Sequence, residues 1–156
     1  MVGFGSAPII SYHFGAENHG ELRNLFRKSL VIIGVTGVLL TVLAEALAGP
    51  LARAFVGYDI ELMEMTRWGF QLYALSFLIS GLNVFGSAFF TALNNGAVSA
   101  AISFLRTLVF QTLSVLLLPL VLDVDGIWLA ILAAELLALA VTGAFLLGGR
   151  KRYHYA

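Results

Sequence analysis

The sequence predicts an all-α protein, a polytopic bundle of helices that cross a membrane. Hydrophobic residues make up 60% of the chain and charged residues 12%, whereas a soluble domain carries about 25% charged residues. Four apolar stretches, at residues 29–48, 69–93, 96–122 and 126–148, each match the roughly 20-residue helix that crosses a hydrocarbon core. Strands of a membrane barrel would be about 10 residues long with alternating polarity, which is not the pattern here. We therefore expect four full spanning helices in a single membrane domain.

The residues between the spans are of the kinds that end helices. Gly-Pro at 49–50, Asn-Asn-Gly at 94–96 and Asp-Val-Asp-Gly at 123–126 are each predicted to end one. Residues 59–66 fit a short interfacial helix as well as a solvated loop. Residues 1–15 have no basic segment before them, so a signal peptide is not expected. They are too short to span and resemble the second half of a helix, so we expect the chain to be a fragment.

Basic residues gather in two polar segments, and this predicts the orientation of the chain. The two segments together carry Arg23, Arg27, Lys28, Arg150, Lys151 and Arg152. Short segments rich in Lys and Arg stay on the cytoplasmic side of a membrane. The other two connections are balanced or acidic, and four crossings return the chain to its starting side. We expect a multi-pass protein of the plasma (cytoplasmic) membrane whose C-terminus is cytoplasmic.

A polar stripe runs along the second span, where the bilayer disfavours polar groups. Its members follow one another at steps of four, three, four, four and three residues: Ser76, Ser80, Asn83, Ser87, Thr91 and Asn94. Such steps place them on one helical face. One interpretation is the wall of a substrate cavity, with Gln71 and Tyr73 near its outer end. The other is helix packing, since small hydroxylated residues let helices approach closely. Both stay open for the serines, while Asn83, a larger amide near mid-membrane, favours the cavity.

Two charged residues are expected near the middle of the membrane. Arg106 lies about ten residues into the third span, and Glu135 about ten residues into the fourth. A charge at that depth costs at least about 2.5 kcal/mol, so each needs a partner or water. Because the two spans are antiparallel neighbours and the charges lie at similar depth, we expect an ion pair. A direct role of either residue in transport is the alternative.

Several kinds of chemistry have no motif in this sequence. The net charge is zero, so no excess of basic residues indicates a nucleic-acid partner. Cysteine is absent, and the three histidines are too scattered to have the spacing of metal ligands. A phosphate-binding loop, a GxSxG elbow and an HExxH motif are also missing. We therefore expect no enzyme activity, no catalytic residues, no metal site and no cofactor.

Four motifs, in order along the chain, resemble the multidrug and toxic compound extrusion (MATE) family. PIISYHFGAEN at residues 8–18 resembles the PIISYNYGAKN that usually ends the family's eighth helix. Residues 51–77 are similar to its passage into the tenth helix, and residues 86–111 to its passage into the eleventh. Residues 124–141 are similar to the entry to its twelfth helix. Each motif is weak alone, but four in the right order are specific, and they cover essentially the whole chain.

This resemblance implies a portion of a transporter with twelve helices in two lobes around a central cavity. Members export bulky cationic or amphipathic compounds in exchange for H⁺ or Na⁺, and the lobes alternate access to the two sides. By the resemblance, this chain holds the end of helix eight and helices nine to twelve. The N-terminal lobe of the transporter is then the expected partner, and the chain is not expected to transport alone.

The resemblance also implies something about the coupling ion. One branch of the family binds it at an aspartate on the first helix, and another uses acidic residues on the seventh and tenth helices. Residues 69–93, which match the tenth helix, contain no acidic residue, so the first branch is the closer match. Arg106 falls on the family's arginine of the eleventh helix, Glu135 on a glutamate of the twelfth, and His13 replaces a usual asparagine.

Two other functions remain as alternatives to a drug exporter. A lipid-linked oligosaccharide flippase shares the broader architecture, but several basic residues would be expected to hold its pyrophosphate. Arg106 is the single basic residue inside a span, which counts against this function. A non-transporting membrane scaffold subunit, whose polar stripe is only a helix interface, is the other alternative.

Overall fold

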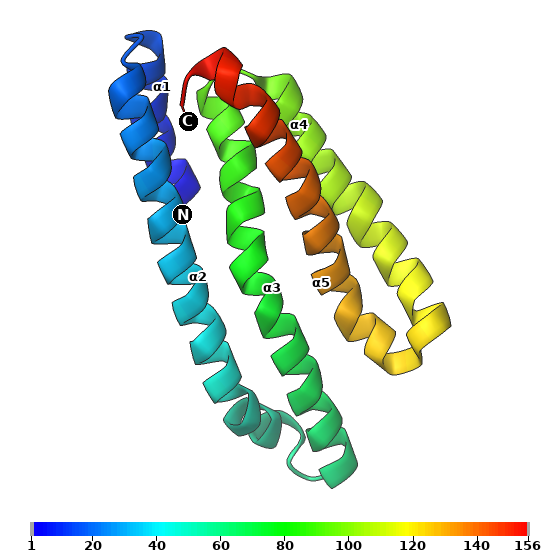
Figure 1. Cartoon of the computed structure of the whole chain (residues 1–156). Coiled ribbons are helices and arrows are strands. Elements are labelled where there is room, and N and C mark those ends of the chain that lie inside the picture. Colours follow the sequence, from blue (N-terminus) through cyan, green and yellow to red (C-terminus); the bar gives the residue numbers. More distant parts are fainter. Residues whose placement is uncertain (1, 156) are drawn as a thin grey trace.

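The chain folds into long helices joined by short turns (Figure 1). The computed structural model describes residues 2–155, and every regular element in that range is helical. In chain order they are α1 (Val2–Gly15), α2 (His19–Val56), α3 (Ile60–Ala92), α4 (Gly96–Phe104), the π-helix η1 (Leu105–Phe110) and α5 (Gln111–Tyr153). The all-α fold class expected from the sequence is confirmed.

Three of the continuous helical stretches are long and apolar enough to cross a membrane. They are His19–Val56, Ile60–Ala92 and Gly96–Tyr153, with 38, 33 and 58 residues. The last of these folds back on itself, as Figure 1 shows where the yellow segment turns into the orange one. The described chain therefore has four long helical arms beside the shorter α1, and a polytopic bundle is confirmed. Where the bilayer begins and ends along each arm stays a prediction.

The fold-back occurs at Asp123, within the turn that the sequence predicted. Asp123 has φ 48° and ψ −129°, which breaks the helical path of α5. Three residues later, a Cβ built on Gly126 would lie 2.4 Å from the carbonyl oxygen of Leu118. A side chain at that position would clash with the backbone of the preceding arm. The tight turn therefore requires glycine, and it brings the second arm of α5 back beside α3.

The prediction that Gly49-Pro50 ends a helix is wrong. Helix α2 continues through Pro50 to Val56 and ends at Gly57. A proline inside a helix removes one hydrogen bond and bends the axis without always ending it. Ala48 and Ala52, on either side of the proline, are 1% and 0% exposed. Their burial in a helix that packs along α3 offsets the lost hydrogen bond, so the last two turns persist.

Residues 59–66 form neither a separate interfacial helix nor a loop, because they are the first turns of α3. Asp59 caps this helix: its Oδ1 accepts hydrogen bonds from the backbone N–H groups of Glu61 at 3.0 Å and Leu62 at 3.2 Å. An aspartate at the N-cap satisfies donors that have no partner inside the helix. The cap lets α3 begin nine residues before the apolar stretch that starts at residue 69.

The two basic segments lie at the same end of the bundle. The rings of His19 and His154 are 5.0 Å apart, and Phe26 lies 4.9 Å from Tyr155. A buried aromatic and aliphatic cluster joins the helices there, and its largest members are Phe85, Phe89, Phe90, Tyr153 and Tyr155. Because these contacts hold the tail against the start of α2, the six basic residues expected on one side do share one end.

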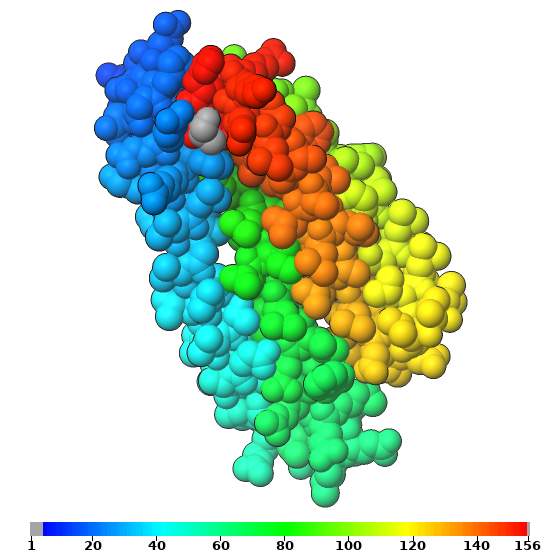
Figure 2. Space-filling view, viewed as in Figure 1, coloured from blue at the N-terminus to red at the C-terminus, as the bar shows by residue number. Residues whose placement is uncertain are grey.

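Apolar side chains cover the outward face of α2. The exposed ones include Val31, Ile32, Val35, Val38, Leu39 and Val42. A continuous row of this kind is unfavourable in water but costs nothing against lipid tails. Figure 2 shows that the molecule is elongated along its helices and that α2 and α3 alone form its lower end. The arms therefore present to lipid the surface expected of membrane-crossing helices.

Candidate functional site

A polar cluster joins three helical segments in the interior of the bundle. Arg106 comes from η1, Asn83 from α3 and Glu135 from α5. The guanidinium Nη2 of Arg106 lies 2.7 Å from Glu135 Oε1, and its Nε donates to both carboxylate oxygens at 3.0 and 3.1 Å. The amide Nδ2 of Asn83 donates to Glu135 Oε2 at 2.7 Å and to the Glu135 carbonyl oxygen at 3.0 Å. The structure thus brings together the two charges expected to pair and adds an amide to them.

Burial makes this cluster expensive to disrupt. Asn83 is fully buried and Glu135 is 8% exposed, whereas 26% of the Arg106 side chain remains accessible. Charge-assisted and bidentate hydrogen bonds of this kind are about twice as strong as neutral ones. They offset the cost of removing a carboxylate from water, but only while every partner is present. The cluster can therefore hold α3, η1 and α5 in one arrangement.

Arg106 lies on the π-helix, a feature that no signal in the sequence predicted. Over Leu105–Phe110 the backbone is wound more widely than in an α-helix, and the N–H of Gln111 bonds to the carbonyl of Arg106 five residues earlier. Short π-helical segments are rare, and they occur frequently at functional sites. Glycine and proline are absent from this segment, so its sequence carries none of the usual signals of a helix distortion.

Two buried polar atoms near the cluster have no hydrogen-bond partner in the described structure. They are Oδ1 of Asn83 and Oγ1 of Thr142, which is two turns after Glu135 on α5. The methyl group of Thr142 packs directly on Gly86 of α3, where a built Cβ would lie 2.2 Å from it. The two helices therefore touch at Gly86 and Thr142, one turn from the polar cluster along α3.

Part of the polar stripe serves contacts between helices. Ser87 hydrogen-bonds the hydroxyls of Ser99 at 2.9 Å and Ser103 at 2.8 Å, and Thr91 donates to Ser99 at 2.7 Å. These hydroxyls connect α3 to α4. Asn94 lies beyond the end of α3, at a turn with φ 56°, and so is not on the face of the helix.

The rest of the stripe is arranged differently. Ser76 is buried and donates to the carbonyl of Tyr73 at 2.6 Å, while Ser80 is half-buried and donates to that of Phe77 at 3.4 Å. Gln71 is half-buried, and Tyr73 is 37% exposed. The role of Gln71, Tyr73, Ser76, Ser80, Asn83 and Ser87 as a substrate cavity stays a prediction. Asn83 and Ser87 bond to neighbouring helices, so that role would fall mainly on the residues nearer the start of α3.

Comparison with known proteins identifies the family. A family model described as MatE matches residues 1–117. The chain belongs to the MatE family. It is therefore a MATE-type, multi-pass membrane protein, as the resemblance predicted, and three of the four motifs lie within the matched residues. The matched region contains Asn83 and Arg106, whereas Glu135 lies beyond it. No curated protein and no solved structure matches the chain.

Proposed function

We propose that the chain works in a cation-coupled multidrug antiporter, which exports bulky cationic or amphipathic compounds in exchange for H⁺ or Na⁺. The observation that carries this proposal is the MatE match on a helical bundle with an ion pair and an amide inside it. Polar groups buried among membrane-crossing helices are costly and mark functional sites by default.

We assign substrate contact to the middle of α3. Tyr73, Phe77 and Ser80 follow one another at steps of four and three, so they share a helical face. The rings of Tyr73 and Phe77 lie 5.5 Å apart, edge to face, and each residue is 37% exposed. Exposed aromatic faces attract organic cations through the ring quadrupole. This face therefore offers both the apolar surface and the cation affinity that such substrates need.

The proposed cavity needs a second wall. Alternating access works by rocking one bundle against another around a central site. We therefore propose that the N-terminal lobe of the transporter is the partner and that Gln71, Tyr73 and Ser80 face it. The half-buried state of Gln71 and Ser80 leaves them accessible for this role. The basic end of the bundle would face the cytoplasm, with the C-terminus on that side of the plasma membrane.

The oligosaccharide flippase has less support. A pyrophosphate would need free basic groups within the membrane, and the guanidinium of Arg106 is already held by the carboxylate of Glu135. The scaffold alternative is favoured by the hydroxyl contacts between α3 and α4. The edge-to-face pair of Tyr73 and Phe77 beside Ser80 favours the exporter instead.

Export of a fluorescent organic cation tests the proposal. The chain would be made together with the N-terminal lobe of a MATE protein in cells that lack their own exporters. We expect the cells to accumulate less dye, and Tyr73→Ala with Phe77→Ala to abolish that difference. Tyr12→Ala is the matched control, because Tyr12 is also exposed but lies on α1. Equal dye accumulation with the native chain and with the double variant, at equal protein levels, would contradict the proposal.

A further inference from the structure

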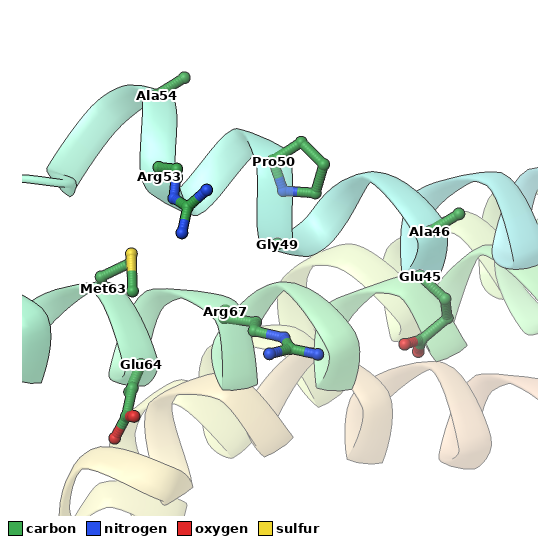
Figure 3. A pocket seen from close by; sticks show the side chains of 9 residues that line it. All are labelled: Glu45, Ala46, Gly49, Pro50, Arg53, Ala54, Met63, Glu64 and Arg67. Atoms are coloured by element: carbon green, nitrogen blue, oxygen red, sulfur yellow. The ribbon is translucent and has the colours of Figure 1, made fainter.

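A charged cleft lies at the end of the bundle that α2 and α3 form alone. It has a volume of about 650 Å³, within the range of ligand sites. The last turns of α2 form one wall and the first turns of α3 the other (Figure 3). The cleft lies far from the Arg106 and Glu135 pair, and none of the residues assigned to substrate contact lines it.

The charged side chains of the cleft are not paired with one another. In Figure 3, Arg53 reaches from α2 toward α3, and Arg67 extends along α3 toward the carboxylate of Glu45. Glu64 also lines the cleft, although its carboxylate is turned away from α2. Within the described residues, Arg106 and Glu135 form the one ion pair, so both guanidinium groups and the Glu45 carboxylate lack a charged partner. Two guanidinium groups and two carboxylates therefore line a space that the protein leaves unfilled, and Glu45 is the carboxylate that the arginines approach.

A proline adds an acceptor to this cleft. Pro50 has no N–H, so the carbonyl of Ala46, four residues earlier, lacks its usual helical donor. Ala46 lines the same cleft as Glu45. Glu45 and Ala46 are consecutive residues of α2, so a carboxylate and a backbone carbonyl both add acceptors to the wall of the cleft.

The depth of the cleft matches that of lipid headgroups. With 33 residues, α3 is about 50 Å long, whereas the hydrocarbon core is about 30 Å thick. Phe55, Tyr58 and Trp68 are 70%, 84% and 52% exposed around this end. Exposed aromatic residues of this kind concentrate at the membrane–water interface. These features favour a position of the cleft at the level of the interface, and exposed Leu47 and Leu51 lie beside it on α2 for contact with acyl chains.

We propose that this cleft binds the headgroup of a phospholipid that carries a phosphodiester and a primary ammonium group, as in phosphatidylethanolamine. The guanidinium groups of Arg53 and Arg67 hold the phosphodiester, since guanidinium groups suit phosphate geometry. The ammonium donates to the Glu45 carboxylate and to the Ala46 carbonyl. The site is independent of export, and neither proposal depends on the other.

Gly49 leaves room for this ligand. A Cβ built there would lie 3.9 Å from Nε of Arg67, which is ordinary contact. Alanine would therefore fit at position 49, while a larger side chain would fill the cleft between the arginine and α2. The pair Gly49→Leu and Gly49→Ala thus blocks or spares the site without altering any charge.

Lipid titration of the full chain, purified and delipidated in detergent, tests the proposal by native mass spectrometry. The probes are phosphatidylethanolamine and phosphatidylglycerol with identical acyl chains, and inorganic phosphate as competitor. We expect Arg53→Gln with Arg67→Gln to weaken phosphatidylethanolamine binding by at least about tenfold, as loss of charge-assisted hydrogen bonds implies. Arg23→Gln, at the opposite end of the bundle, should bind like the native chain. Glu45→Gln should remove the preference for phosphatidylethanolamine over phosphatidylglycerol.

Three results would overturn the proposal. Equal phosphatidylethanolamine binding by the native chain and the double arginine variant would show that the cleft is not the site. Equal affinity of the native chain for the two lipids would refute recognition of the ammonium group. Displacement of the lipid by inorganic phosphate would assign the cleft to free phosphate. If the double variant does not fold, Gly49→Leu decides the question, because it should lose binding that Gly49→Ala retains.

Discussion

The amide of Asn83 donates a hydrogen bond of 2.7 Å to the carboxylate of Glu135 and another of 3.0 Å to the backbone carbonyl of the same residue. Through these bonds, one side chain of α3 fixes both the position and the backbone of α5. Since Arg106 holds the other side of the carboxylate, the three residues form one unit across three helical segments. The buried polar interior of this bundle therefore maintains the relative position of its helices, whatever else it does.

Loss of the carboxylate charge should destabilise the bundle. In Glu135→Gln, Arg106 keeps its charge but loses its ionic partner, and breaking a buried pair typically costs about 3 to 5 kcal/mol. The accessible quarter of the Arg106 side chain favours the lower end of that range. Thermal unfolding of the purified chain in detergent would measure the change.

The matched control replaces both partners. Arg106→Met with Glu135→Met leaves no unpaired charge, and such replacements are often neutral or stabilising. We expect the double variant to recover most of the lost stability. A double variant as unstable as Glu135→Gln would contradict the ion pair.

Asn83 and Ser80 should respond differently to substitution, although both belong to the polar stripe. Asn83→Leu removes two buried hydrogen bonds and leaves the Glu135 carboxylate with one partner fewer, at a cost of about 1 to 3 kcal/mol. Ser80→Ala loses only a 3.4 Å bond to its own helix, so stability should be unchanged within about 0.5 kcal/mol. Unfolding midpoints and dye export, measured on the same preparations, separate the two effects. A normal midpoint for Asn83→Leu together with lost export would instead assign Asn83 to the cavity.

The contact between Gly86 and Thr142 should not tolerate a larger residue. A Cβ on Gly86 would lie 2.2 Å from the methyl carbon of Thr142, so Gly86→Ala forces α3 and α5 apart at about 1 to 3 kcal/mol. Thr142→Ser removes that methyl group and should restore most of the stability. Gly143→Ala is the control, since a Cβ there meets nothing within 4 Å. Equal unfolding midpoints for Gly86→Ala and Gly143→Ala would show that the helices do not touch here.

High pH should release the C-terminal tail. Burial, and to a lesser extent the neighbouring Tyr153, raises the pKa of Tyr155 from 10.0 to about 12. Its hydroxyl donates to the carbonyl of Leu146 at 2.5 Å. Because the folded chain favours the neutral phenol, this contribution to stability is fully present below pH 10 and is lost as the pH rises toward 12. The ultraviolet absorbance of tyrosinate should show one ionisation at higher pH than the others, and Tyr155→Phe should remove it. If that ionisation persists in the variant, it belongs to another tyrosine.

Local chemistry explains which parts of the fold the sequence predicted. The turns at Asn95 and Asp123 were found because Asn and Asp adopt positive φ and cap helices there: Asn95 accepts from the N–H of Val98, and Asp123 has φ 48°. The prediction of a helix end at Pro50 was wrong, because the burial of Ala48 and Ala52 against α3 outweighs the missing hydrogen bond. That burial is set by packing between distant segments, which residue types near the proline do not reveal.

The candidate site was predicted only in part, because local spacing places its residues but packing between distant helices joins them. The spacing of the stripe showed that Asn83 would avoid lipid, and matching depth suggested that Arg106 would meet Glu135. Neither argument predicted that Asn83 contacts the ion pair. The rotation of α3 relative to α5 is fixed by contacts between the two helices, such as the one at Gly86. The π-helix around Arg106 also had no local signal, since its wide turn is set by the surroundings of the segment.

The most direct test is to find from which side of the membrane single introduced cysteines can be labelled. It shows whether the chain is a membrane bundle with both basic segments at one end. The sequence contains no cysteine, so each introduced thiol can be labelled alone in sealed membranes with a reagent that does not cross them. We predict that Arg23→Cys and Lys151→Cys are labelled from one side, and Tyr58→Cys and Asp125→Cys from the other. Labelling of positions 23 and 151 from opposite sides would contradict the account.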